Sequence, residues 1–196
     1  LGSGTFTLAN ATLTNNIASQ NGGGIYVGSG TFTVNGTATL KGNKATSQSG
    51  GGIYLGGGTF TVSQNGVLNL GGANQVEGNI AGSFGGGVFC GAPFTVNGTS
   101  TIQNNSAANG GGVYINTGYS ATFAKQMSLL NNTATGDGGG LYVAGGSMTM
   151  AQNTISGNNA ANGGAVYLTG GSIKATGAST IQNNYSSENG GAYYVS

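Results

Sequence analysis

The sequence predicts an all-β fold: a right-handed parallel β-helix, or β-solenoid, of seven three-stranded coils with about 28 residues each. Three phrases, each repeated along the chain, carry this prediction. One is a glycine turn followed by an apolar triplet with a central aromatic residue. The second is an alternation of threonine with apolar residues, and the third is an aliphatic residue followed at a fixed distance by asparagine. A fixed period in this range indicates a stack of similar coils, and the general preference of parallel crossovers gives the hand.

The aromatic phrase first occurs as Gly24-Ile25-Tyr26-Val27, and its ring recurs at intervals of 28, 35, 25, 28, 25 and 27 residues. The residues on either side of each ring are apolar and point inward, so strand alternation places the rings outward. The rings form a candidate contact stripe about 30 Å long at strand spacing. Its members are Tyr26, Tyr54, Phe89, Tyr114, Tyr142, Tyr167 and Tyr194. Two alternatives stay open: the rings stack on one another under a loop, or they are buried against another chain.

The threonine phrase, as in Thr31-Phe32-Thr33-Val34, has the two-residue alternation of a half-buried strand. We expect it to return with Phe94-Thr95-Val96 and then in weaker form with Thr122-Phe123-Ala124. Two threonine rows on one face suggest ice binding. However, the expected rows break at Pro93, Ala124 and Lys174. Ordinary β-propensity therefore explains the threonines more simply.

The third phrase ends in two positions that differ in the residue types they accept. The first is Asn or Gly, which indicates a left-handed backbone that only these residues adopt readily. The second is Asn in every copy, so the side-chain amide itself is needed. Amides of stacked coils can hydrogen-bond to one another, which predicts an internal structural ladder. Its members are Asn16, Asn43, Asn79, Asn105, Asn132, Asn158 and Asn184.

Residues 1–196 are expected to form one β-solenoid domain, a segment of a longer solenoid or of one stacked end to end. Residues 193–196 followed by residues 1–6 imitate residues 25–32, so the two ends are in phase. Unpaired strand edges at an uncapped solenoid end favour stacking. We therefore expect copies of the same chain as partners, end to end and laterally, in a filament.

Composition excludes several function classes. The chain has four lysines, three acidic residues, no histidine and one cysteine. With so little charge we expect no nucleic-acid partner, and with no run of 18 apolar residues we expect no membrane insertion by this segment. Glu77, Asp137 and Glu188 lie in different coils and columns, so we expect no catalytic residues, no metal site and no cofactor. Cys90 stands in an aliphatic column and is expected in the core.

Residues 155–167 carry a pattern that resembles the repeats of the chlamydial polymorphic outer membrane proteins. That family is marked by GGA-[ILV] and F-x-x-N tetrapeptides in autotransported surface adhesins. Here an aliphatic residue replaces the Phe in every copy, and GGG replaces GGA in five of the seven copies. The resemblance implies a coil of the same type and a location at the cell surface.

Together these features predict an extracellular or cell-surface structural or adhesive β-solenoid, not an enzyme, that stacks into a fibre or longer stalk. The alternative is an adhesin passenger module that binds a host ligand or glycan through its aromatic stripe or loops. Ice binding through the threonine rows is a third possibility.

Overall fold

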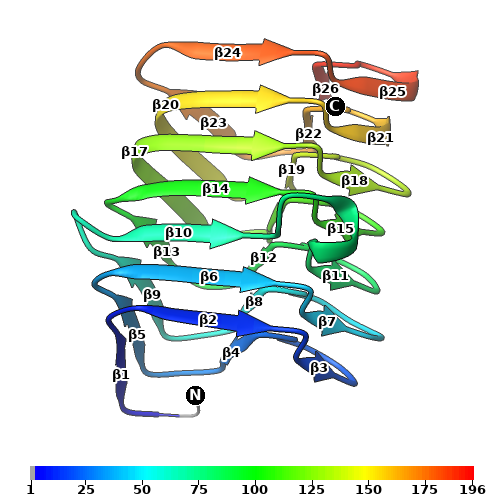
Figure 1. The fold of residues 1–196 in the computed structure, drawn as a ribbon. Coiled ribbons are helices and arrows are strands. Elements are labelled where there is room, and N and C mark those ends of the chain that lie inside the picture. Colours follow the sequence, from blue (N-terminus) through cyan, green and yellow to red (C-terminus); the bar gives the residue numbers. More distant parts are fainter. Residues whose placement is uncertain (1–2) are drawn as a thin grey trace.

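A computed structural model describes residues 3–196; Leu1 and Gly2, and with them the junction expected at Leu1, lie outside the described residues. The chain winds into a stack of about seven coils whose strands are all parallel to their neighbours. Figure 1 shows the chain crossing the near side from left to right, returning behind and rising toward the C-terminus. This path is a right-handed coil, and the predicted parallel β-helix is confirmed.

Three sheets run along the solenoid axis. The aromatic sheet contains β4 (Ile25–Val27), β8 (Ile53–Leu55), β12 (Val88–Cys90), β16 (Val113–Ile115), β19 (Leu141–Val143), β22 (Val166–Leu168) and β26 (Tyr193–Val195). The corner sheet contains β3 (Ile17–Ala18), β7 (Lys44–Ala45), β11 (Ile80–Ala81), β15 (Ser106–Ala107), β18 (Thr133–Ala134), β21 (Asn159–Asn162) and β25 (Tyr185–Asn189).

The third and largest sheet has a back half and a front half. The back strands are β1 (Thr5–Leu8), β5 (Thr31–Val34), β9 (Thr59–Val62), β13 (Phe94–Val96) and β23 (Ser172–Ala175). The front strands are β2 (Ala11–Thr14), β6 (Thr37–Lys41), β10 (Val67–Leu70), β14 (Thr99–Gln103) and β24 (Ser179–Gln182). In the fifth and sixth coils, β17 (Ser120–Leu130) and β20 (Ser147–Ser156) run through both halves without a break.

Each coil thus holds four strand segments rather than the three expected. The additional segment is the short corner strand, whose alanine column turns inward: Ala45 and Ala134 are buried. Its first residue points outward, as with Lys44 and Ile80, so the corner is a true strand with alternating faces. A separate strand therefore follows the asparagine of the third phrase and contains its alanine. In most coils this strand is too short to give a two-residue periodicity in the sequence.

The predicted register of the threonine phrase is wrong in the fifth coil. Phe123 pairs with Val96 and Met150, and Ala121 takes the place opposite Phe94. Ala124 consequently lies outside the two threonine rows, and the break predicted there does not exist. Serine replaces threonine at three places in the outward rows, and only Pro93 and Lys174 lack a hydroxyl group. Their members are Thr5, Thr31, Thr59, Pro93, Ser120, Ser147 and Ser172 in one row, and Thr7, Thr33, Thr61, Thr95, Thr122, Thr149 and Lys174 in the other.

The core is a continuous apolar column inside the coils. Phe60, Phe94 and Phe123 are among the largest fully buried side chains, and the rings of Phe60 and Phe94 stack with their centroids 4.9 Å apart. Cys90 is fully buried in this column. Burial raises the pKa of its thiol to about 12, so it packs as a small apolar residue.

Close backbone contact explains the glycine turn that precedes each aromatic triplet. A Cβ placed on Gly51 would lie 2.5 Å from the carbonyl oxygen of Ile80 and 2.6 Å from that of Gly86. Any side chain at Gly51 would therefore force neighbouring coils apart.

The Asn/Gly position of the third phrase adopts the left-handed backbone in six coils. Asn15, Asn104, Asn131 and Asn183 have φ between 54° and 58°, and glycine does the same in two other coils. Gly78 is the exception, with φ −68° and ψ 151°. A short 3-10 helix, η1 (Gln75–Glu77), enters the corner of the third coil directly before it and changes the direction of the chain.

Candidate functional site

The seven asparagines of the third phrase form one hydrogen-bonded ladder inside the corner. In each step the side-chain oxygen accepts two bonds from the asparagine one coil below. Asn105 Oδ1 accepts from the backbone N and from Nδ2 of Asn79, both at 2.9 Å. Asn105 in turn donates through N and Nδ2 to Asn132 Oδ1, at 3.1 and 3.0 Å. All these amides point the same way along the axis.

The remaining amide proton of each central asparagine reaches a front strand. Asn105 Nδ2 donates to the carbonyl oxygen of Leu70 at 3.0 Å, and Asn132 Nδ2 to that of Ile102 at 2.9 Å. Asn43, Asn79, Asn105, Asn132 and Asn158 have no exposed surface, so water cannot replace these bonds. Each buried amide therefore depends on the coil on either side of it.

The aromatic stripe is a column of stacked rings on the outer face of the aromatic sheet. Successive ring centroids lie 4.7–5.1 Å apart except at one step, where Phe89 and Tyr114 are 5.6 Å apart. At Tyr167 and Tyr194 the rings are within 3° of parallel. Ring faces are therefore used for contacts within the stripe, and the edges with their hydroxyl groups are turned toward the surroundings.

A free contact surface would be exposed along its whole length, but the exposure of the stripe differs from ring to ring. Tyr26 is 48% exposed, whereas Phe89 and Tyr114 are each only 9% exposed. Phe84 covers this central part, with its ring centroid 4.7 Å from that of Tyr114 and 6.5 Å from that of Phe89. One of the two open alternatives, mutual stacking under a loop, therefore describes the middle of the stripe. Sequence reasoning missed Phe84, although it stands at the position before the glycine turn where most other coils have asparagine.

Burial changes the acid–base behaviour of the covered tyrosines. Burial, followed by repulsion from Tyr142, raises the pKa of Tyr114. Burial also raises the pKa of Tyr54, with smaller contributions from Tyr26 and Tyr119. Their hydroxyl groups therefore stay protonated at neutral pH.

The position before the glycine turn forms a second polar column, on the outside, which the sequence analysis did not identify. Asn109 Oδ1 accepts from the backbone N of Asp137 at 2.8 Å, and Asn162 Oδ1 accepts from that of Asn189 at 3.2 Å. The repeat at a constant offset from the glycines is the signal that could have revealed it. The column members are Asn21, Ser49, Phe84, Asn109, Asp137, Asn162 and Asn189.

Asp137 and Glu188 lie in different coils, as expected from the sequence, but one asparagine side chain links them. Asn162 Nδ2 donates to Asp137 Oδ1 and to Glu188 Oε2, both at 3.0 Å. The two acids do occupy different columns, but Asn162 in the coil between them joins them.

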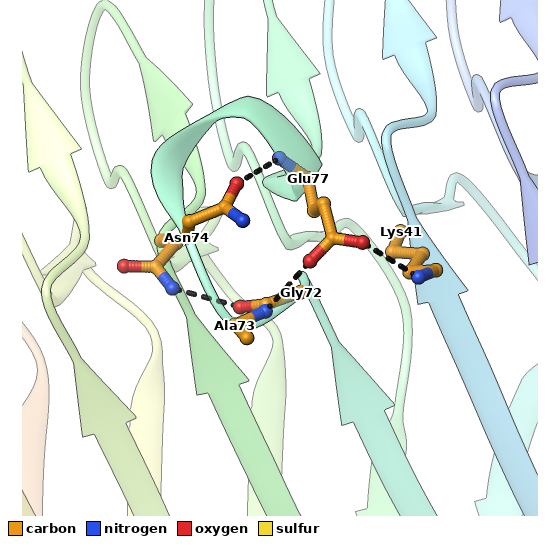
Figure 2. A network of polar contacts seen from close by, with 6 residues as sticks. Lys41, Gly72, Ala73, Asn74 and Glu77 are labelled. Atoms are coloured by element: carbon orange, nitrogen blue, oxygen red, sulfur yellow. Dashed lines mark hydrogen bonds and ion pairs between the residues drawn. The ribbon is translucent and has the colours of Figure 1, made fainter.

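Glu77 lies apart from these two acids, in the loop that enlarges the third coil (Figure 2). Its Oε1 is 2.7 Å from Lys41 Nζ, and its Oε2 accepts from the backbone N of Ala73 at 3.1 Å. Asn74 caps the short helix by accepting from the backbone N of Glu77 at 3.2 Å. The hydrogen bond from Lys41, and then that from Ala73, lowers the pKa of the Glu77 carboxyl.

The same loop is also joined to the coils that follow it. Asn104 Nδ2 donates to the carbonyl oxygen of Gly72 at 2.7 Å, and Gln75 Nε2 donates to that of Asn131 at 2.7 Å. Together with Lys41 these contacts link the second, third, fourth and fifth coils.

Among the residues that the structure describes, no three His, Cys, Asp or Glu side chains gather where they could hold a metal ion. Within the same residues, no helix has the length and apolar character needed to span a bilayer.

One family model matches two segments of the chain that contain these rows. It describes the Chlamydia polymorphic membrane protein repeat and matches residues 10–28 and 126–144. Both segments are similar to this repeat. The resemblance stated from the sequence is therefore confirmed for the repeat. No curated protein and no solved structure matches the chain.

The matched segments cover the same structural unit in two coils. Each matched segment begins at a front strand, passes through the ladder asparagine and the corner strand, and ends after the aromatic triplet. The units contain Asn16 with Tyr26 and Asn132 with Tyr142. The repeat therefore contains both the internal ladder and the outer ring, and it excludes the back strand, where the register varies.

Proposed function

We propose that this chain is part of a rigid, non-enzymatic β-solenoid that serves a structural or adhesive role at the cell surface. The observation that carries the proposal is the uninterrupted ladder from Asn16 to Asn184, which links every coil to the next by side-chain amides that are buried in the central coils. A stack that is fully hydrogen-bonded along its axis resists bending and local opening. The repeat type, which the family model associates with Chlamydia membrane proteins, supports a location at the outer surface.

The stacked stripe favours the structural role over sugar binding through aromatic faces. A sugar ring packs on the face of an aromatic ring, and within the stripe neighbouring rings already cover those faces. As a contact surface, the stripe would offer ring edges and hydroxyl groups. The stripe from Tyr26 to Tyr194 thus remains a proposed site of lateral contact with another copy or with a host surface.

Stacking along the axis is the second part of the proposal. Phe6 in the first described coil is 48% exposed and Val195 in the last is 68% exposed, although both belong to inward-facing rows. Further coils, of the same chain or of another copy, would bury these side chains. Seven coils add about 34 Å to such a fibre or stalk at about 4.8 Å per coil.

Two measurements test the proposal. Protease treatment and antibody labelling of intact source cells should detect this segment from the outside, and a segment that is protected until the cells are lysed would contradict surface location. Negative-stain microscopy of the purified chain should show rods of constant width. Flexible or globular particles would contradict the structural role.

A further inference from the structure

Asparagine followed by glycine occurs seven times in the sequence, and the structure divides these pairs into two groups. Four lie in the outer polar column before the glycine turns, and three lie at the corner between the back and front strands. Because glycine has no side chain to hinder the approach, its backbone nitrogen can attack the side-chain amide of the asparagine. The pairs are Asn21-Gly22, Asn109-Gly110, Asn162-Gly163 and Asn189-Gly190 in the column, and Asn35-Gly36, Asn65-Gly66 and Asn97-Gly98 at the corner.

Hydrogen bonds to the next coil occupy both reacting groups in the outer column. The backbone N of Gly110 donates to the carbonyl oxygen of Asp137 at 2.9 Å, and Asn109 Oδ1 accepts from the backbone N of Asp137 at 2.8 Å. Gly22 and Gly163 donate to the next coil in the same way. A nitrogen whose hydrogen is held by a carbonyl oxygen must give up that bond before it can lose the proton and act as a nucleophile.

The pairs at the corner are not all held in this way. The backbone N of Gly66 donates to the carbonyl oxygen of Ser63 at 2.9 Å within a tight turn. In contrast, no group within residues 3–196 accepts the backbone N–H of Gly36, and the preceding Asn35 is exposed. Gly98 has no acceptor within the same residues either, but it is buried. Asn35-Gly36 therefore combines a free nucleophile with access to water.

A hydroxyl group also activates the side chain of Asn35. Ser63 Oγ, at the corner one coil above, donates to Asn35 Oδ1. A donor at this oxygen stabilises the negative charge that forms there when a nucleophile adds to Cγ. Nδ2 of Asn35, which would leave, has no partner within residues 3–196. Nδ2 of Asn162 in the outer column, by comparison, is held by two carboxylates.

We propose that Asn35 is a site of spontaneous deamidation through a cyclic imide. The nitrogen of Gly36 loses its proton to a base in solution and forms a bond to Cγ of Asn35. The bond between Cγ and Nδ2 breaks, and Nδ2 leaves as ammonia with a proton from water. A second water molecule then adds to one of the two carbonyl carbons of the imide ring and opens it. The product is aspartate or isoaspartate at this position.

The modification changes the corner between β5 and β6. It adds a carboxylate to a chain with three acidic residues and removes the formal net charge of +1. Isoaspartate also adds a methylene group to the backbone where the coils are in close contact: a Cβ on Gly36 would lie 1.9 Å from the carbonyl oxygen of Ala9. The inference concerns the chemistry of the chain itself and is independent of the proposed surface role.

The test incubates the purified, folded chain in water enriched in heavy oxygen and follows each asparagine–glycine pair by peptide mass spectrometry. Conversion exchanges an NH₂ group for OH, so the product carries the heavy isotope. We expect Asn35 to convert several times faster than Asn65 and Asn109, and faster in mildly alkaline buffer, because the nitrogen must lose a proton. In guanidinium the chain is unfolded, and the three asparagines should convert at similar rates.

Variants of the hydroxyl donor separate its effect from exposure. Ser63→Ala should slow the conversion of Asn35 about fivefold, the effect of one hydrogen bond in the transition state, whereas Ser63→Thr should keep the rate. Asn97 receives no such bond and should convert at the same rate in both variants. If Asn65 or Asn109 converts as fast as Asn35 in the folded chain, if Ser63→Ala does not slow Asn35, or if Asn35 does not convert, the proposal is wrong. Circular dichroism checks that each variant is folded.

Discussion

Phe84 lies over Tyr114, with the two ring centroids 4.7 Å apart, and closes the middle of an otherwise outward-facing aromatic column. The position of Phe84 is occupied by asparagine in four other coils and by serine or aspartate in the other two. One substitution in a polar column thus converts part of an exposed stripe into a covered one.

Phe84→Ala should uncover Phe89 and Tyr114 and remove one ring contact. We expect a loss of about 0.5–1.5 kcal/mol in the free energy of unfolding from the ring pair, in addition to the lost burial. Urea unfolding followed by circular dichroism measures it. Asn109→Ala, in the same column one coil above, tests whether the ring is the cause: an equal loss there would assign the effect to the column instead.

Replacement of Asn105 by Ala breaks the ladder at its centre. The backbone N and Nδ2 of Asn79 lose their acceptor, and the oxygens of Asn132 and Leu70 lose a donor. Buried groups without partners should cost about 1–3 kcal/mol of unfolding free energy. Asn131→Gly is the matched control, because glycine occupies the same left-handed position in other coils and should be tolerated. A variant Asn105→Ala that melts with the parent would show that the ladder does not stabilise the fold.

Alkaline conditions should weaken the covered part of the stripe. Burial raises the pKa of Tyr54 and Tyr114 above their usual value of about 10, so the folded state favours the neutral phenols. Their contribution to stability is complete below pH 10 and is lost as the pH rises through the folded-state pKa values. The double variant Tyr54→Phe, Tyr114→Phe should lose less stability between pH 9 and pH 11 in thermal melts. Tyr185→Phe, outside the stripe, should behave as the parent does.

Acid should release the loop of the third coil. Lys41 and then the backbone N of Ala73 lower the pKa of Glu77, so its carboxylate favours the folded loop. This contribution is present above the usual value of 4.5 and is lost as the pH falls through the lowered pKa. Hydrogen exchange of residues 72–78 should therefore accelerate, relative to other loops, on acidification below that value. In Glu77→Gln the relative protection should be low at neutral pH and should not change with acid. Persistent acid-dependent protection in that variant would assign the transition to another group.

No glycan-cleaving activity should depend on the three acids. The variant Glu77→Gln, Asp137→Asn, Glu188→Gln removes every carboxylate side chain in the sequence and should leave any background hydrolysis unchanged. Release of reducing ends from a panel of polysaccharides measures it. Activity in the parent that disappears in this triple variant would contradict a non-enzymatic role.

Much of the fold could be read from the sequence because the same side-chain requirements recur in each coil. A left-handed backbone restricts Asn15 or Gly42 to two residue types, and close coil contacts restrict Gly51 to one. The buried ladder requires the amide of Asn105 and of its equivalents. Such constraints act on single positions, so they leave a visible period.

Where the spacing between these positions varies, only the tertiary structure decided which residues pair. The row to which the Phe123 side chain belongs depends on how many residues form the corner that follows it. The sequence Thr122-Phe123 does not indicate that number. The covering of Tyr114 by Phe84 and the joining of Asp137 to Glu188 through Asn162 are contacts between coils. They depend on side chains from different coils reaching one another. Sequence alone therefore determined the coil and its internal rows, and the three-dimensional stack determined which outer side chains meet.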